Sequence, residues 1–332
     1  MPYAVHPRPF TFPLAGAGVL VLAFTLALVG AGGCATEDTS SVEPGSYVAL
    51  VEASGLAIRG GGTAAIVCGD ETPDRLWGVN LANTDARWQL IFADRTPPLD
   101  DLEALAPWGE HDVVALCSLS RTKTRLKDPA KRKRLALVRL ASDARTVLGI
   151  SVYENLRRDV LRALEGPAGT QLREPDALSA GGPNNGGLNV EGLAVWQGRL
   201  LLGLRSPTTV AGPIVLPITN PEELFADHPP RFDDAVIVPA GPDEGIRSMT
   251  AGPDGAVLIL LGPVTDAPGP AQRLIRWWPE TSRVQDLTVP GLADVSPVEG
   301  ISLLANGRLL AVSDYKPPLP GPVLHHLAIE GP

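Results

Sequence analysis

A hairpin-like segment recurs along the chain and limits the folds that the chain can adopt. In the clearest copy, residues 189–207, an apolar run is followed by the turn residues Gln197 and Gly198 and then by a second apolar run. Two apolar runs joined by a short glycine-containing turn are typical of a β-hairpin. Related segments begin at Ala53, Asp101, Gly245 and Pro297. A repeat of roughly forty to fifty residues indicates a propeller or a solenoid.

Strand-like runs fill each repeat. Four can be placed in each of the first four repeats, but only three in the last, where the sequence ends. One extra strand is predicted before the first repeat, at residues 46–52. If this strand completes the last blade, the ring has no long exposed edge. We therefore predict an all-β fold, a β-propeller of five four-stranded blades closed by the N-terminal strand.

An insertion interrupts the repeats between the second and the third copy, at residues 154–188. Leu156, Val160 and Leu164 recur there with helical spacing, and Gly166 and Pro167 supply a stop. These features predict one short insert helix at the rim of the ring. The alternative is a sixth, degenerate blade in this interval.

The first 34 residues have the layout of a bacterial export signal. An apolar run from Leu14 to Val29 is followed by small residues, and residues 31–34 resemble a lipobox that ends at Cys34. Ala31 stands where that motif usually has leucine, so ordinary signal cleavage is the alternative. We predict a signal peptide at 1–34, lipidation of Cys34, a tether at 35–45 and the propeller domain at 46–332. The protein is then exported and anchored in a membrane at its periplasmic or extracellular face, or else secreted.

Composition excludes some functions. The 332-residue chain has a formal net charge of -9, which argues against nucleic-acid binding because phosphates require a basic face. The histidines show no metal-ligand spacing, and the common hydrolase and nucleotide-binding motifs are absent from the sequence. Cys68 and Cys117 fall at similar places in neighbouring repeats, which predicts buried free thiols. We predict a monomer.

Two hairpins carry a family resemblance. The first is Asn189-Val190-Glu191-Gly192-Leu193-Ala194 with residues 201–207, and the second is Gly245-Ile246-Arg247 with residues 258–263. Together they resemble an uncharacterised bacterial family, domain of unknown function 3616. The resemblance implies a propeller-like fold and brings no settled activity. The repeated Glu-Gly-Leu or Glu-Gly-Ile strand starts are more loosely similar to esterase-like phytase propellers.

Charged residues recur where the first strand of a repeat begins and where the second ends. In an antiparallel meander both positions emerge on the same face of the ring, so we expect them to surround one mouth of the central channel. The expected ligand-binding residues, for a polar or anionic ligand or a partner segment, are Glu103, Arg121, Glu191, Arg205, Arg247 and Lys316. The alternative for Glu191 and Arg205 is an ion pair that only stabilises the ring.

A calcium site is a further possibility at this mouth. A two-residue turn at Asn306 and Gly307 would place Glu299 opposite Asp314, and the two carboxylates would then share a proton or a cation. With Asp70 they form the expected metal ligands, and calcium is the expected cofactor if there is one. The sequence leaves open whether the protein is an enzyme; the alternative to a binding protein is a calcium-assisted phosphoester or ester hydrolase.

Overall fold

The computed structural model describes residues 50, 52–92, 96–124, 126–165, 172, 176–295, 297–314 and 322–330. All described residues belong to one compact unit, Ser46–Pro332. The predicted signal peptide, the tether and Cys34 therefore lie outside the described residues. Within the described part, no helix has the length and apolar character needed to cross a membrane.

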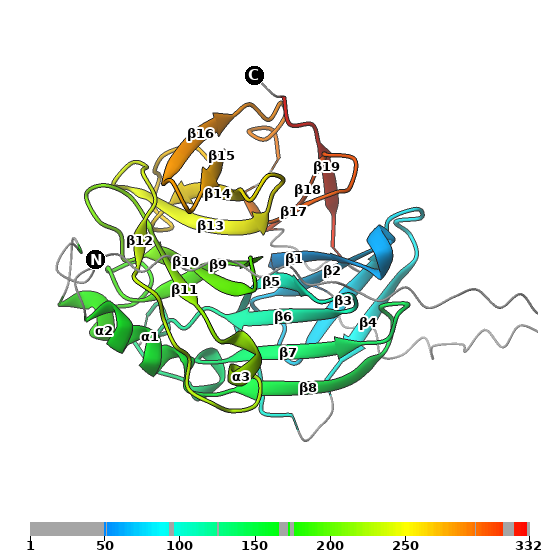
Figure 1. The fold of residues 1–332 in the computed structure, drawn as a ribbon, viewed down its shortest axis with the longest axis horizontal. Coiled ribbons are helices and arrows are strands. Elements are labelled where there is room, and N and C mark those ends of the chain that lie inside the picture. The colour runs from blue at the N-terminus through cyan, green and yellow to red at the C-terminus, as the bar shows by residue number, and fades with distance from the viewer. Residues whose placement is uncertain are drawn as a thin grey trace, which may run out of the picture. The chain divides into compact units, whose positions relative to one another are not determined.

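This unit is a β-propeller of five antiparallel sheets (Figure 1). Blade one consists of β1 (Ala53–Arg59), β2 (Ala64–Gly69), β3 (Arg75–Asn80) and β4 (Arg87–Ile91). Blade two consists of β5 (Leu102–Trp108), β6 (Asp112–Cys117), β7 (Leu135–Leu140) and β8 (Val147–Tyr153). Blade three consists of β9 (Asn189–Trp196), β10 (Arg199–Ser206), β11 (Ile214–Ile218) and β12 (Val236–Ile237).

The last two blades follow the same order. Blade four consists of β13 (Glu244–Ala251), β14 (Val257–Pro263), β15 (Arg273–Trp278) and β16 (Arg283–Leu287). Blade five has three described strands, β17 (Val298–Leu303), β18 (Leu309–Ser313) and β19 (Leu324–Leu327). The predicted five-bladed propeller is confirmed, and the sixth blade is not formed in the described part of the insertion.

The first strand of each blade lies innermost and closes the ring. β1 contacts β5 and β17, β9 contacts β5 and β13, and β13 also contacts β17. Glycines allow this close approach, because a Cβ atom at Gly300 would lie 2.3 Å from the carbonyl oxygen of Ser54 in the neighbouring blade. At Gly55 a Cβ atom would lie 2.6 Å from the backbone nitrogen of Leu105. Gly55 and Gly300 are thus required by packing between blades.

A β-bulge occurs at the same place in each of the five inner hairpins. In blade two, Leu102 pairs with Cys117 and Ala104 with Leu116, so Glu103 is one residue extra on its strand. Corresponding one-residue shifts occur in the other four blades. The residues at the bulges are Ser54, Glu103, Glu191, Arg247 and Glu299. Since a bulge re-aims a side chain, the repeat places five side chains around one end of the ring.

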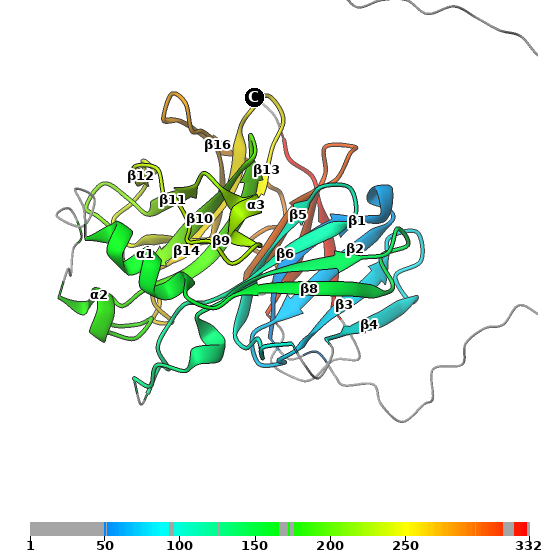
Figure 2. The same cartoon turned by 60° about the horizontal axis from the view of Figure 1, so that its bottom comes forward.

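Apolar side chains fill the spaces between blades, and the insertion covers one of them. The predicted helix is confirmed as α1 (Leu156–Leu164), and two four-residue helices, α2 (Ala177–Ala180) and α3 (Pro221–Leu224), lie nearby. Leu156, Val160 and Leu164 are buried in a cluster shared by blades two and three. Figure 2 shows α1 and α2 beside blade three. The insertion therefore adds to the core between these two blades.

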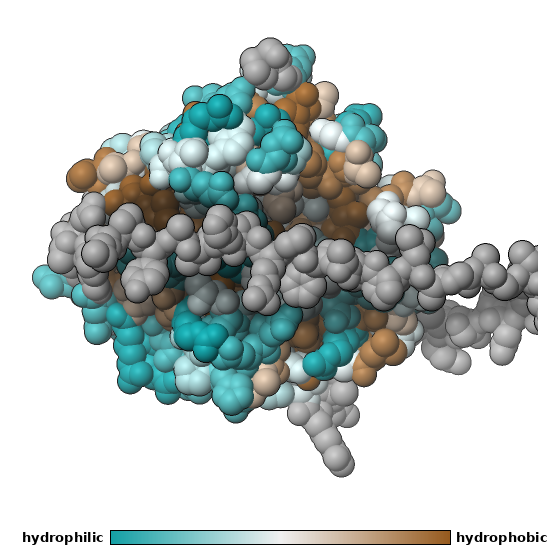
Figure 3. Space-filling view, viewed as in Figure 1, coloured by the Kyte–Doolittle hydropathy of each residue, from teal (hydrophilic) through white to brown (hydrophobic). Residues whose placement is uncertain are grey.

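Closure of the ring by the N-terminal strand lies mostly outside the described residues. Leu50, the first described residue, takes part in a β-bridge and packs with Leu310 and Val312 of blade five. Figure 3 shows hydrophilic side chains over much of the outline of the propeller, with hydrophobic ones visible nearer the middle of the view. Cys68 and Cys117 are buried free thiols, as predicted. Burial raises the pKa of both thiols, to about 12 for Cys117.

Candidate functional site

The five bulges open onto one cavity of about 740 Å³. Each blade contributes its bulge residue, and the ends of the second strands and the adjoining loops supply the rest of the wall. Nine acidic and four basic side chains of the described residues line it. The acidic ones are Glu52, Asp70, Glu71, Asp101, Glu103, Glu191, Asp266, Glu299 and Asp314. The basic ones are Lys123, Arg132, Arg205 and Arg247.

Most of the residues expected at the mouth line this cavity. Of the described candidates, only Arg121 does not line it, because its Nη1 donates a hydrogen bond to the carbonyl oxygen of Ala180 in the insertion, at 2.9 Å. Arg121 thus ties β6 and its following loop to α2. Lys316 lies outside the described residues.

One side of the cavity is a network of paired charges. Glu191, which is 3% exposed, accepts a hydrogen bond from Arg205 Nη1 at 2.9 Å, and its Oε2 lies 3.1 Å from Arg247 Nη1. Arg247 also pairs with Glu299 in the next blade. Burial alone would raise the pKa of Glu191, but the two guanidinium groups outweigh it and hold the pKa below its ordinary value. This is the stabilising arrangement considered from the sequence, and it links blades three, four and five.

The other side holds three carboxyl groups, of which only Asp101 has a basic partner among the described residues. Carboxylate oxygens of Asp70, Asp101 and Glu103 all lie within 4.8 Å of one another. Arg132 Nη1 lies 2.9 Å from Asp101 Oδ2, and Ser118 donates a hydrogen bond to Asp101. None of the hydrogen bonds or ion pairs between described residues involves the Glu103 side chain, and one oxygen of Asp70 is buried without a partner. The charge of this side is therefore only partly compensated.

Because the charge is only partly compensated, the pKa values of these three carboxyl groups are raised. Burial, together with the charges of Glu52 and Asp101, raises the pKa of Asp70 to about 9. Burial and the neighbouring acids also raise the pKa of Glu103 well above its ordinary value. For Asp101, burial raises the pKa to about 6 against the opposing effects of Arg132 and Ser118. Without a counter-ion, Asp70 and Glu103 therefore retain protons near neutral pH, whereas Asp101 is mostly ionised.

The expected metal ligands are only partly brought together. Among the described residues, acidic groups close enough to share an ion are Asp70 with Asp101 and Glu103, and Asp70 with Glu52 and Glu71. Glu299 is paired with Arg247, and burial raises its pKa to about 7 despite that partner. Asp314 lines the cavity but belongs to neither group.

The predicted register of blade five was wrong. Leu304 accepts from Gly307 and donates to Arg308, so the turn has three residues instead of two. Val298 pairs with Ser313 and Gly300 with Val312, which leaves Glu299 at the bulge and not opposite Asp314. A one-residue shift of this kind is enough to separate the two carboxylates.

Two acidic residues that sequence reasoning missed lie two positions before a bulge. Glu52 precedes Ser54 in this way, and Asp101 precedes Glu103. Their φ angles are 50° and 59°, in the left-handed region that non-glycine residues seldom adopt. Strand alternation could not have found them, because both residues precede their strands, β1 and β5, and have left-handed backbone.

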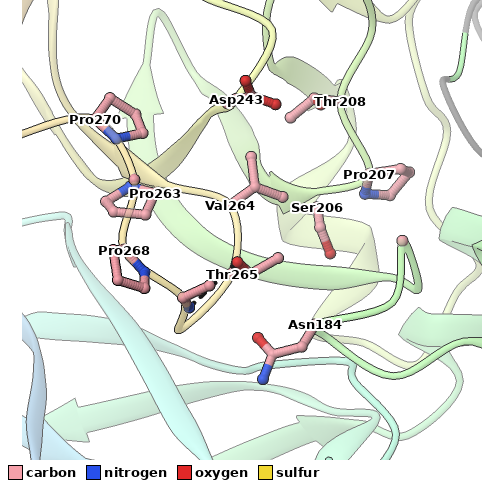
Figure 4. Close-up of a pocket in the computed structure, with 13 residues that line it drawn as sticks. Asn184, Ser206, Pro207, Thr208, Asp243, Pro263, Val264, Thr265, Pro268 and Pro270 are labelled. Atoms are coloured by element: carbon pink, nitrogen blue, oxygen red, sulfur yellow. Dashed lines mark hydrogen bonds between the residues drawn. The ribbon is translucent and has the colours of Figure 1, made fainter.

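A smaller cavity of about 320 Å³ lies beside the first. Figure 4 shows Pro263, Pro268 and Pro270 on one side, with Pro207 and Thr208 across from them. The loop between β14 and β15 forms a wall of both cavities, since Pro263, Thr265, Ala267 and Pro270 line each of them. Asp266 lies in this loop.

The solved structures that resemble the chain do so only distantly. A glutaminyl cyclase from Myxococcus xanthus is 13% identical, with a TM-score of 0.43, 86% of this chain covered and 94% of that one. A GH74 enzyme from Niastella koreensis is 12% identical, with a TM-score of 0.43 and coverages of 81% and 42%. For hydrazine synthase from Kuenenia stuttgartiensis the identity is 8%, the TM-score 0.40 and the coverages 81% and 58%. The chain thus spans less than two thirds of the last two, and we draw nothing about activity from these likenesses.

No curated protein matches the chain in sequence. The model of one family, described as a protein of unknown function (DUF3616), matches residues 178–297. This segment contains both hairpins that carried the resemblance. Over residues 178–297 the chain therefore matches DUF3616, and its fold is a five-bladed β-propeller.

Proposed function

We propose that this propeller is a binding protein whose acidic mouth holds a calcium ion and, next to it, a polar ligand. The observation that supports this proposal is the group formed by Asp70, Asp101 and Glu103, whose carboxylate oxygens lie within 4.8 Å of one another in the cavity wall. Calcium prefers such all-oxygen surroundings and completes its shell of six to eight oxygens with water or ligand atoms.

Electrostatics favour a cation over bound protons as the pH rises. Two carboxylates 4.8 Å apart repel each other by about 3.5 kcal/mol at an effective dielectric constant of about 20. Arg132 compensates this repulsion at Asp101 alone, because neither Asp70 nor Glu103 has a basic partner among the described contacts. A divalent cation would replace the protons that these groups otherwise retain.

The same charges disfavour an anionic ligand as the main occupant of the mouth. Nine acidic side chains against four basic ones give the lining an acidic excess. Arg205 and Arg247, the residues expected to hold an anion, are engaged by Glu191, Glu299 and Asp266. A hydrolase that binds phosphate through these arginines would first have to break buried ion pairs. Binding without hydrolysis is thus the better supported function.

Calcium titration followed by calorimetry tests the proposal on protein freed of metal with a chelator. We expect saturable binding that weakens at least tenfold in Asp70→Asn and in Glu103→Gln. The control is Glu110→Gln, which removes one negative charge at an 87% exposed side chain in the β5–β6 turn. Equal binding by all three variants, or no calcium binding at millimolar concentration, would contradict it. Binding of propylamine in place of calcium would mean that the cation is organic.

We also propose that the protein is exported and anchored by a lipid on Cys34. The apolar run from Leu14 to Val29 and the small residues before Cys34 support this proposal. Labelling with radioactive palmitate in a bacterial host tests it. Label should enter the native chain and be lost in Cys34→Ser; equal labelling of both, or of neither, would refute the anchor.

A further inference from the structure

The loop between β14 and β15 carries one acidic side chain, Asp266, at the edge of the large cavity. Pro263 ends β14, and Pro268, Gly269 and Pro270 follow Asp266 in residues 264–272, which form no strand or helix. The residue on either side of Asp266 lines both cavities. This loop is thus the partition between them, and its position depends on what holds Asp266.

Three donors from separate parts of the fold converge on the Asp266 carboxylate. Arg205 Nη2, at the end of β10, lies 2.9 Å from Oδ1. Lys123 Nζ, in the loop after β6, lies 3.0 Å from Oδ2, and Asn184 Nδ2, in the insertion, donates to Oδ2 at 3.0 Å. The backbone nitrogen of Asp266 donates in turn to Asn184 Oδ1 at 3.1 Å.

These three donors can bind a carboxylate from a ligand as well as the carboxylate of Asp266. Arg205 is 6% exposed and its Nη1 is held by Glu191, so its Nη2 is fixed in position. Burial would raise the pKa of Asp266, but Asn184, Lys123 and Arg205 hold it below its ordinary value. Lys123 and Asp266 are about half exposed, so solvent and solutes reach the contact.

We propose that Lys123, Asn184 and Arg205 form an anion subsite that Asp266 fills from within the chain, and that a carboxylate on a ligand displaces Asp266. Displacement frees the loop, which joins the two cavities. The inference goes beyond the calcium proposal, because the subsite shares no residue with the proposed calcium ligands.

A competing carboxylate has to overcome the local concentration of Asp266. Tethering on a short loop gives a group an effective concentration in the millimolar range. A small free carboxylate should therefore compete poorly with Asp266 in the native chain. In a variant without the Asp266 carboxylate, the same small carboxylate should bind at millimolar concentration.

The test compares acetate binding by the native protein, Asp266→Ala and Asp233→Ala at constant ionic strength. Asp233 is the matched control, since it is also an exposed acid paired with an arginine, Arg199, at 2.6 Å, but lies away from the cavity. We expect acetate to bind Asp266→Ala at least tenfold more tightly than the other two proteins. Lys123→Ala added to Asp266→Ala should abolish that gain.

Absence of acetate binding to Asp266→Ala, or equal binding to Asp233→Ala, would show that Asp266 is only a structural tie. If Asp266→Ala does not fold, a fluorophore on Ala267→Cys in a chain that also carries Cys34→Ser replaces it, since Ala267 is exposed, Cys68 and Cys117 are buried, and Cys34 would otherwise compete for the label. Succinate should then shift its emission, and no shift overturns the subsite. Calcium binding by Asp266→Ala is measured separately, so failure of this inference and failure of the calcium proposal are distinguishable.

Discussion

Glu191 and Glu103 occupy equivalent bulge positions in adjacent blades. Removal of their charges should nevertheless change the free energy of unfolding in opposite directions. Glu191 is 3% exposed and neutralises Arg205 and Arg247, which are 6% and 9% exposed. Glu103 has no basic partner among the described contacts and lies beside Asp70 and Asp101. A comparison of variants at these two residues therefore separates the effect of neighbouring charges on stability from the effect of backbone position.

Glu191→Gln should destabilise the propeller. Breaking a buried ion pair by removing one partner costs about 3–5 kcal/mol. Arg205 keeps Asp266 and Arg247 keeps Glu299, so we expect a value near the lower end, about 3 kcal/mol. In a domain of this size that corresponds to a fall in Tm of roughly 6–12 °C.

Glu103→Gln should stabilise the metal-free protein, and more so at higher pH. Because burial raises the pKa of Glu103, the folded state retains a proton that the unfolded state releases above its ordinary pKa. The unfolding free energy then falls by up to about 1.4 kcal/mol per pH unit, a loss that glutamine removes. The gain in unfolding free energy of Glu103→Gln over the native protein should thus be at most about 2.8 kcal/mol larger at pH 7 than at pH 5.

Urea unfolding in the presence of a chelator, at pH 5 and pH 7, measures both variants. A destabilised Glu103→Gln at pH 7, similar to Glu191→Gln, would refute the assignment of paired and unpaired sides to the mouth. So would a loss below about 1 kcal/mol for Glu191→Gln, the size of an exposed pair.

Other consequences can be checked on the same protein. Raised pKa values of about 9 for Asp70 and about 6 for Asp101 mean that stability without metal falls as pH rises from about 4 through these values; calcium should flatten this profile in thermal melts. A profile that rises over this range would contradict the shifts. Cys68 and Cys117 should react with a thiol reagent only after unfolding, because both are buried and protonated; fast reaction in the native state would contradict this. Gly300→Ala should lose at least about 1–3 kcal/mol, since its Cβ would lie 2.3 Å from a carbonyl oxygen of blade one; a neutral result in urea would show that the blades can separate slightly.

Repetition made the architecture predictable. Each copy of the hairpin pattern folds as an inner pair of strands, and the charged strand starts Glu103, Glu191, Arg247 and Glu299 do meet at one cavity. These positions are set by local pairing and by the ring, both of which follow from the repeat itself.

Contacts that depend on loops were not predictable in the same way. The three-residue turn after Leu304 shifted Glu299 relative to Asp314, since turn geometry decides register. Asp266 lies in a loop, and its partners come from three segments distant in sequence. The sequence offered the ion pair of Glu191 with Arg205 as an alternative, and only the folded chain shows Asp266 as a second partner of Arg205.

Anomalous diffraction from a crystal soaked in terbium chloride tests the central claim most directly, because terbium takes the same oxygen ligands as calcium. The acidic side of the mouth should show one strong peak between Asp70, Asp101 and Glu103, and excess calcium should remove it. No peak in the cavity, or a peak at Glu299 and Asp314 instead, would contradict the proposed cation site.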